Sequence, residues 1–177
     1  MKLHKLDPCA ADGLTAVVET PRGSRHKYDY DREAGAFRLS KTLPSGEVFP
    51  FDFGFIPRTL APDGDPLDSL VLIEDPTFPG CLVDVRLIGV IEAEQSAGKK
   101  KERNDRLIAV ATTSHRHGQA SALPDIGKPI IDEITEFFVE YNKVQGKTFR
   151  PKGQHGPKRA EALFQKALRQ YRKNSEK

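Results

Sequence analysis

Residues 63–73 read Asp-Gly-Asp-Pro-Leu-Asp-Ser-Leu-Val-Leu-Ile, an acidic turn that runs directly into an apolar segment. The apolar run is typical of a buried strand, and Gly, Pro and Asp are the usual turn formers. Pro66 favours an extended conformation at the residue before it, so the carboxylates of Asp63 and Asp65 are expected to project to the same side. Asp68 can join them only through a local bend. The stretch predicts a turn that presents carboxylates where a core strand begins.

Carboxylates placed this close together repel one another unless a cation or a raised pKa relieves the repulsion. Oxygen ligands suit a hard cation such as Mg²⁺, which keeps its other coordination positions for water and substrate phosphate. An ordinary acidic turn before a strand is the alternative, and the spacing alone leaves both interpretations open. An EF-hand loop is set aside because Leu67 stands at a ligand position and Asp68 stands where Gly is required.

The overall composition is that of a folded protein with a well-solvated surface. The chain has 177 residues, of which 37% are hydrophobic and 30% charged, so we expect a single domain over residues 1–177. No apolar run reaches membrane-spanning length, and residues 1–6 lack the apolar core of a secretory signal. We therefore expect a cytoplasmic protein without a membrane partner. Cys9 and Cys81 are too few for a disulfide framework.

Positive charge is concentrated in residues 146–177, which hold ten Lys or Arg and two Glu. The charges alternate with a helical apolar pattern, which favours a solvated helix face over an RNA site. Nucleic-acid binding by a small barrel remains the weakest alternative. It is disfavoured because exposed stacking aromatics are not evident in the strands and the carboxylates of 63–68 would repel a phosphate backbone.

Short runs typical of β-strands, separated by turn residues, fill the first two thirds of the chain and suggest a small barrel. They cover residues 16–19, 27–30, 37–39, 70–73, 82–91 and 107–111. Residues 96–104, which include three consecutive lysines, are expected to form an exposed hairpin loop. The five histidines show no spacing typical of a metal site, which favours loop positions.

Helical periodicity follows this region. Apolar residues recur at helical spacing over 130–141, with Pro129 in the first turn and Gly146 just beyond the end. A second amphipathic helix is expected over 160–171, after a Pro-, Gly- and His-rich connection at 149–157. The predicted fold class is α+β, a small barrel covered by two C-terminal helices.

The acidic motif, taken with the segments around it, resembles the soluble family I inorganic pyrophosphatases. The signature of that family is Asp-x-Asp-Pro-apolar-Asp entering a strand, which matches residues 63–68. Further matching segments occur in the family's order, so the resemblance covers about residues 14–171. They are Val17-Val18-Glu19-Thr20-Pro21, Lys27-Tyr28, Phe53-Gly54-Phe55-Ile56, Pro79-Gly80, Gly89-Val90, residues 107–110 and Phe137-Phe138 ahead of Tyr141.

The resemblance implies a five-stranded OB-like barrel and Mg²⁺-dependent hydrolysis of inorganic pyrophosphate to two phosphates by a metal-activated water. It also implies a homo-oligomer, either a trimer or a hexamer. Asp65 would accept the proton of the attacking water. The residues that would hold metal are Asp63, Asp68, Glu19 and Asp29, and those that would bind the phosphate groups are Lys27, Lys41, Arg106 and Tyr141.

Several departures from the family pattern fall on these positions. Gln95 and Asn104 stand where the family has metal-binding Asp, although Glu102 or Asp105 could supply a carboxylate if the basic loop 99–103 shifts register. The other departures are Arg106 for Lys, Lys41 for Arg, Asp29 for Glu, Asn142 for Lys, and Phe49 and Phe53 for Tyr. Because a neutral amide is a weaker Mg²⁺ ligand than a carboxylate, weakened activity is one expectation. A catalytically degenerate phosphate-binding or scaffold protein is the alternative.

Overall fold

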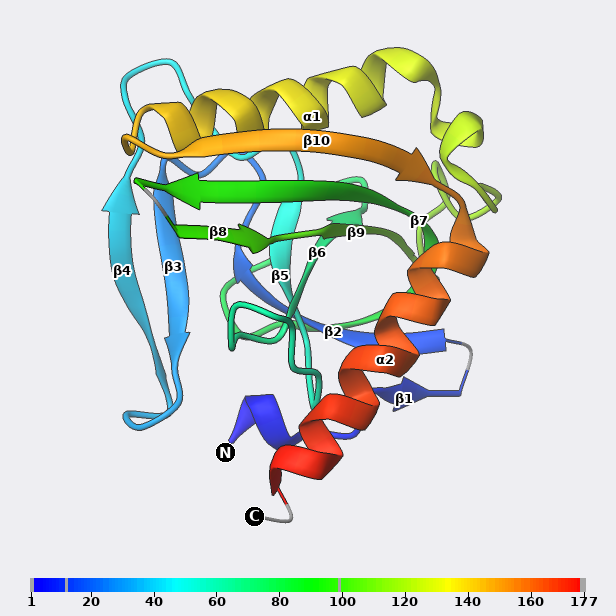
Figure 1. Cartoon of the computed structure of the whole chain (residues 1–177). Coiled ribbons are helices and arrows are strands. Elements are labelled where there is room, and N and C mark those ends of the chain that lie inside the picture. The colour runs from blue at the N-terminus through cyan, green and yellow to red at the C-terminus, as the bar shows by residue number, and fades with distance from the viewer. Residues whose placement is uncertain (1, 12, 99, 176–177) are drawn as a thin grey trace.

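The computed structural model describes residues 2–11, 13–98 and 100–175, which form a mixed sheet, a separate hairpin and two α-helices (Figure 1). The strands are β1 (Cys9–Ala10), β2 (Gly13–Thr20), β3 (His26–Asp31), β4 (Ala36–Thr42), β5 (Asp52–Ile56), β6 (Leu67–Leu72), β7 (Leu82–Ala97), β8 (Lys100–Arg103), β9 (Arg106–Ala111) and β10 (Thr148–His155). The helices are η1 (Leu3–Lys5), η2 (Leu123–Ile126), α1 (Lys128–Lys143) and α2 (Pro157–Ser175).

The sheet closes on itself through strand β2. The pairing order β2–β5–β6–β9–β7 returns to β2, which pairs with β5 at one edge, Val17 opposite Phe55, and with β7 at the other, Leu14 opposite Val85. The pair β6–β9 is parallel and the other barrel pairs are antiparallel. The expected OB-like five-stranded barrel with two C-terminal helices is therefore confirmed.

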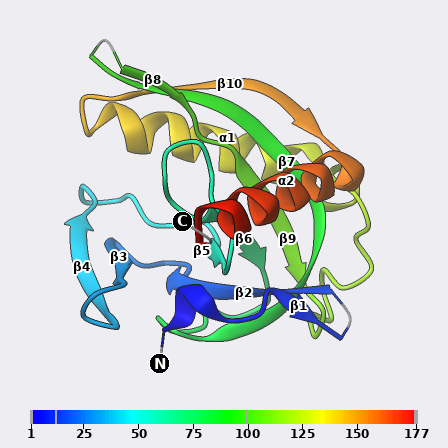
Figure 2. The ribbon, with the colours of Figure 1, turned by 60° about the horizontal axis from the view of Figure 1, so that its bottom comes forward.

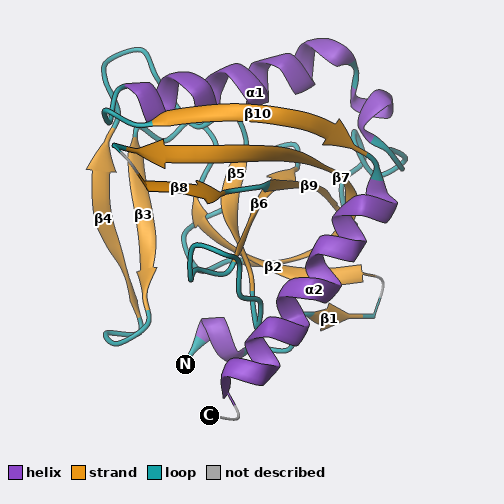
Figure 3. Ribbon diagram, in the orientation of Figure 1, coloured by secondary structure: helices purple, strands orange, loops and turns teal. Residues whose placement is uncertain are grey.

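Both helices bury an apolar stripe against the strands, and they lie outside the barrel in Figure 3. Helix α1 contributes Ile134 and Phe138 to a core shared with strands β5, β6, β7 and β9. Helix α2 contributes Ala160 and Phe164 to a second core with β2 and β7, while its Lys and Arg side chains are exposed. This burial, rather than intrinsic helix propensity, stabilises the two helices. The same exposure fits the solvated helix face expected for the basic segment.

Two expectations about local structure are wrong, and a third is right only in part. Residues 149–157 are not only a connection, since β10 pairs with β7 and accommodates Pro151 and Gly153 at a register shift. The exposed hairpin expected at residues 96–104 is present, but most of it is strand rather than loop, because β7 continues to Ala97 and pairs with β8. Lys99 lies outside the described residues. Several histidines lie in regular structure, among them His26 and His155, which lie in strands.

Strand β5 was not expected as a strand because Phe53-Gly54-Phe55 is buried on both faces and shows no alternation. Gly54 allows the close approach of β2, since a Cβ at this position would stand 1.9 Å from the backbone oxygen of Val17. We expect Gly54→Ala to lower the free energy of unfolding by about 1–3 kcal/mol, because two backbones would have to move apart. Urea denaturation measures this. Gly156→Ala, which meets no atom within 4 Å, is the matched control and should change stability by less than about 0.5 kcal/mol.

The hairpin β3–β4 forms its own two-stranded sheet. Figure 2, like Figure 1, shows it on the opposite side of the barrel from β1 and the start of α2. Nearly every residue of β4 is exposed, whereas Tyr30 of β3 is buried beside Phe55. Among the described residues, the structure contains no helix long and apolar enough to cross a membrane.

Candidate active site

A cavity of about 470 Å³ lies between one face of the barrel, the hairpin β3–β4 and the end of α1. All nine residues singled out by the sequence line it, although they come from distant parts of the chain. They are Glu19, Lys27, Asp29, Lys41, Asp63, Asp65, Asp68, Arg106 and Tyr141. The structure therefore brings the complete predicted set together at one place.

The acidic turn enters the cavity just before strand β6. Gly64 has a φ of +93°, which a residue with a side chain rarely adopts, and its N–H donates to the carbonyl of Ala61 at 3.0 Å. The backbone N–H of Asp65 donates to Asp63 Oδ1 at 3.1 Å. Burial raises the pKa of Asp63 to about 6; the Asp65 N–H opposes that rise, and the neighbouring carboxylates of Asp68 and Asp65 add to it. The turn thus holds carboxylates whose repulsion a cation would relieve.

Asp65 is the most exposed of these acids. Its side chain is 77% accessible, and Oδ1 lies 3.5 Å from a guanidinium nitrogen of Arg32. The side chain therefore projects into the open part of the cavity, where a water molecule could reach it.

Asp68, on the floor of the cavity, is engaged by Arg106. The guanidinium Nη1 of Arg106 donates to Asp68 Oδ2 and to Asn104 Oδ1. Asn104 in turn donates from Nδ2 to Gln95 Oε1 at 2.8 Å. Burial raises the pKa of Asp68, while the positive charges of Arg106 and Lys27 oppose that rise. One side of the cavity is therefore a continuous chain of hydrogen bonds.

Glu19 of β2 and Lys27 of β3 both line the cavity, and the charge of each acts on the other. Glu19 is 8% exposed, and its Oε1 accepts the backbone N–H of Tyr30 at 2.8 Å. Burial raises the pKa of Glu19 to about 7, although the charge of Lys27 opposes this rise. Lys27 forms an ion pair with Asp29, and burial lowers its pKa. The pKa of the acid is thus raised and the pKa of the base lowered, so that the uncharged form of each is favoured. Such shifts are common at functional sites.

Lys41 links the hairpin to the end of α1. Lys41 of β4 donates to Gln145 Oε1 and lies 5.6 Å from the ring centre of Tyr141. Burial lowers the pKa of Lys41 to about 8, with Lys27 and Lys147 contributing. The hydroxyl of Tyr141 is buried and meets no hydrogen-bond partner of good geometry among the described residues, although the Gln145 amide is close enough to affect its pKa. A buried hydroxyl of this kind is ready to bind a ligand oxygen.

The positions that depart from the family pattern have structural uses here. Phe49 and Phe53 are buried and contact each other with ring centres 5.7 Å apart. Asn142 is 2% exposed and donates to the carbonyl of Phe138 at 2.8 Å, so its amide serves the helix backbone. Glu102 lines the cavity, whereas Asp105 binds Arg103 at 2.7 Å and the Ala93 N–H at 3.1 Å. Of the two acids considered as replacements, only Glu102 faces the cavity.

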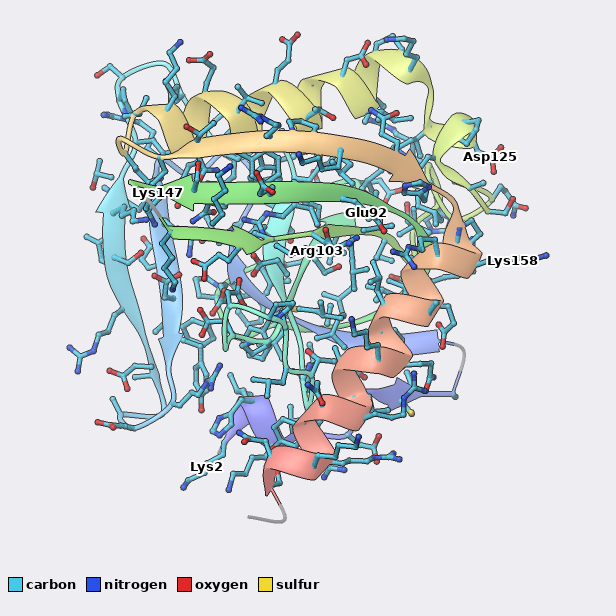
Figure 4. The ribbon with its side chains drawn as sticks, in the orientation of Figure 1. Lys2, Glu92, Arg103, Asp125, Lys147 and Lys158 are labelled. Carbon is cyan, nitrogen blue, oxygen red and sulfur yellow. The ribbon has the colours of Figure 1, made fainter. Side chains whose placement is uncertain are left out.

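Sequence reasoning missed several polar cavity residues, among them His4, Arg32, Gln145 and Lys147. His4 lies in η1 rather than in a loop. Figure 4 labels Lys147, which lies where the chain passes from α1 to β10. In the sequence these residues resemble ordinary surface groups, because only the tertiary fold brings them to the acidic turn. Their spacing along the sequence matches no motif that would have identified them as site residues.

Comparisons with known proteins agree with this geometry. The sequence model of the family described as inorganic pyrophosphatase matches residues 16–172. The inorganic pyrophosphatase of Nostoc sp. is 35% identical over 90% of this chain and 92% of its own length. That of Halalkalibacterium halodurans is 41% identical over 76% of this chain and 80% of its own.

Solved structures show the same likeness across the whole fold. The crystal structure of inorganic pyrophosphatase from Thermus thermophilus has a TM-score of 0.89 and 34% identity, and the match covers 97% of this chain and 99% of that one. The Helicobacter pylori enzyme gives a TM-score of 0.85 at 31% identity, covering 95% of this chain and 99% of that one. The chain therefore belongs to the family I inorganic pyrophosphatases, as its sequence motifs predicted.

Proposed function

We propose that this protein is an inorganic diphosphatase that hydrolyses pyrophosphate to two phosphates. The observation that carries the proposal is the single cavity in which the acidic turn 63–68 faces lysines from the hairpin and the hydroxyl of Tyr141. Such an arrangement provides a proton acceptor on one side and cationic phosphate ligands on the other. Family membership supports the same reaction.

We propose Mg²⁺ as the cofactor, because the available ligands are hard oxygens. Among the described residues, no three His, Cys, Asp or Glu side chains converge as a ready ligand set. This fits a cation that is held by one or two carboxylates and keeps several waters. Asp63 would be the principal protein ligand, with Glu19, Asp29 and Asp68, which is already paired with Arg106, acting directly or through water. A bound Mg²⁺ supplies positive charge for the phosphate oxygens and makes a coordinated water more acidic.

The remaining site residues act on the substrate. Asp65, exposed in the mouth of the cavity, would take the proton of the attacking water. Lys27, Lys41 and Tyr141 would hold phosphate oxygens and so orient the phosphoanhydride bond. Lys41 offers a single point charge rather than the bidentate fork of Arg, so its contribution to orientation is smaller. Arg106, which also lines the cavity, would add positive charge near the substrate.

The family likeness supports a proposal for the setting of the reaction. We propose a cytoplasmic enzyme that forms one domain over residues 1–177 and assembles as a homo-oligomer, a trimer or a hexamer. Pyrophosphate is the proposed small-molecule partner, and we propose no nucleic-acid or membrane partner.

The test is phosphate release from pyrophosphate with Mg²⁺ present, measured on purified full-length protein. We expect multiple turnovers, which stop on addition of excess EDTA and resume when Mg²⁺ is restored. Calorimetry with pyrophosphate separates the two candidate functions. Binding of pyrophosphate without phosphate release would favour the degenerate binding protein, which the neutral side chains Gln95 and Asn104 motivate, and would contradict the enzyme.

A further inference from the structure

Arg106 places a permanent positive charge inside an acidic cavity. The side chain is 5% exposed, and its guanidinium carbon lies 4.8 Å from the ring centre of Phe138 and 5.6 Å from that of Phe149. Phe53 lies on a further side at 5.8 Å. Aromatic faces attract a guanidinium and limit its movement. The charge is therefore fixed in position.

The polar groups around Arg106 hold it against one side of the cavity, formed by Asp68, Gln95, Asn104 and Arg106, which we call the guanidinium wall. Nη1 donates to Asp68 and Asn104, and Asn104 is itself oriented by its 2.8 Å hydrogen bond to Gln95. The only carboxylate of this wall is thus already paired with a cation. Its other two members are neutral amides, which are weak ligands for a hard cation.

Asp63 and Asp65, the other two carboxylates of the acidic turn, have a different balance of charge. Asp63 Oδ1 accepts a backbone N–H, and Asp65 is largely exposed, with a contact to Arg32 of 3.5 Å. Arg106 donates its hydrogen bonds to Asp68 and Asn104 rather than to these two carboxylates, although its charge still acts on Asp63, so the attraction for a cation is stronger here than at Asp68. A cation placed against the guanidinium wall would be repelled by Arg106, and this repulsion is strong at a few ångströms in a partly dehydrated cavity.

We infer that Arg106 serves as a built-in cation that occupies the guanidinium wall and restricts divalent cations to a single tight site beside Asp63 and Asp65. The inference rests on the proposed function, since it concerns the metal that the reaction uses. It makes Arg106 a determinant of metal number as well as a source of charge for the substrate.

The experiment counts bound Mn²⁺ in the absence of phosphate and pyrophosphate, by calorimetry and by the electron paramagnetic resonance signal of free Mn²⁺. The wild-type protein should bind one Mn²⁺ tightly. Arg106→Met keeps an apolar stem among the three aromatic rings but removes the charge. It should bind Mn²⁺ at least tenfold more tightly or acquire a second site.

Arg103→Met is the matched control. Arg103 of β8 lies beside Glu92 of β7, at 2.6 Å, and also binds Asp105, so it belongs to a cluster outside the cavity (Figure 4). Losing this guanidinium removes the same charge from the protein and should change Mn²⁺ affinity by less than threefold. An equal gain in both variants would show an effect of net charge alone and would overturn the inference.

A second variant keeps the inference testable if Arg106→Met fails to fold. Asn104→Asp adds a carboxylate next to Arg106, which should pair with it, so Mn²⁺ affinity should change by less than threefold and the count should stay at one. Two tight Mn²⁺ sites in the wild type, or a new site in Asn104→Asp, would overturn the inference. So would unchanged binding in Arg106→Met. If the wild type turns over pyrophosphate, these results leave the proposed function intact; failure to release phosphate tests that function separately.

Discussion

Asp65→Asn is expected to lower kcat for pyrophosphate hydrolysis by about 100-fold or more, because a general base contributes about 10²–10⁴ to the rate and an amide cannot accept the proton. The substitution is nearly isosteric. Asp65 is 77% exposed, so the free energy of unfolding should change by less than about 0.5 kcal/mol. Steady-state phosphate release at saturating Mg²⁺ gives kcat, and urea denaturation gives the stability.

Asp75→Asn is the control for this prediction. Asp75 is exposed and does not line the cavity, so the variant removes the same charge from the surface without touching the site. It should retain wild-type kcat. Equal rates for Asp65→Asn and the wild type would remove Asp65 from the proposed mechanism.

Glu19→Gln is expected to stabilise the metal-free protein at pH 8. The pKa of Glu19 rises from 4.5 to about 7 in the fold, so between these values the folded state binds more protons than the unfolded state. Stability must then fall as pH increases through this window and level off above it. The cost approaches ~3 kcal/mol at pH 8 if the full shift applies. Gln avoids this cost, and its carbonyl oxygen can still accept the Tyr30 N–H.

The measurement is urea denaturation with EDTA present, at pH 4.5 and pH 8. The two proteins should be nearly equal in stability at pH 4.5, where Glu19 is protonated in the folded state and about half protonated in the unfolded state, so that little of the cost is present. The variant should be the more stable at pH 8. Glu33→Gln, at an exposed turn position, should follow the wild type at both pH values. A wild-type protein as stable as Glu19→Gln at pH 8 would show that Glu19 is already ionised without cost.

Local sequence signals were sufficient where one element carried its own pattern. The run of apolar residues ending at Tyr141 gave α1, and the apolar run after the acidic turn gave β6. Strand β10 was not predicted because Pro151 and Gly153 are typical of loops, and only pairing with β7 makes the segment a strand. Its structure is therefore fixed by tertiary contacts that no local pattern shows.

The candidate site shows the same division. The residues of the motif and their order were visible in the sequence, and the structure places all nine at one cavity. What the sequence could not show is how they pair. Arg106 and Asp68 are 38 positions apart, and their contact depends on the parallel pairing of β6 and β9. The sequence likewise could not show that the side chain of Asn142 is buried and donates to the carbonyl of Phe138 in its own helix.

The separate hairpin β3–β4 has a consequence for inactivation. It carries Lys27, Asp29 and Lys41, yet β4 is almost entirely exposed and neither strand belongs to the barrel sheet. Segments with few buried contacts open at a lower free energy than the global transition. Mild heating should therefore detach the hairpin β3–β4, with Lys27 and Lys41, while the barrel stays intact. Amide hydrogen exchange would show fast exchange in residues 26–42 beside protected barrel strands, and catalysis would be lost before the fold.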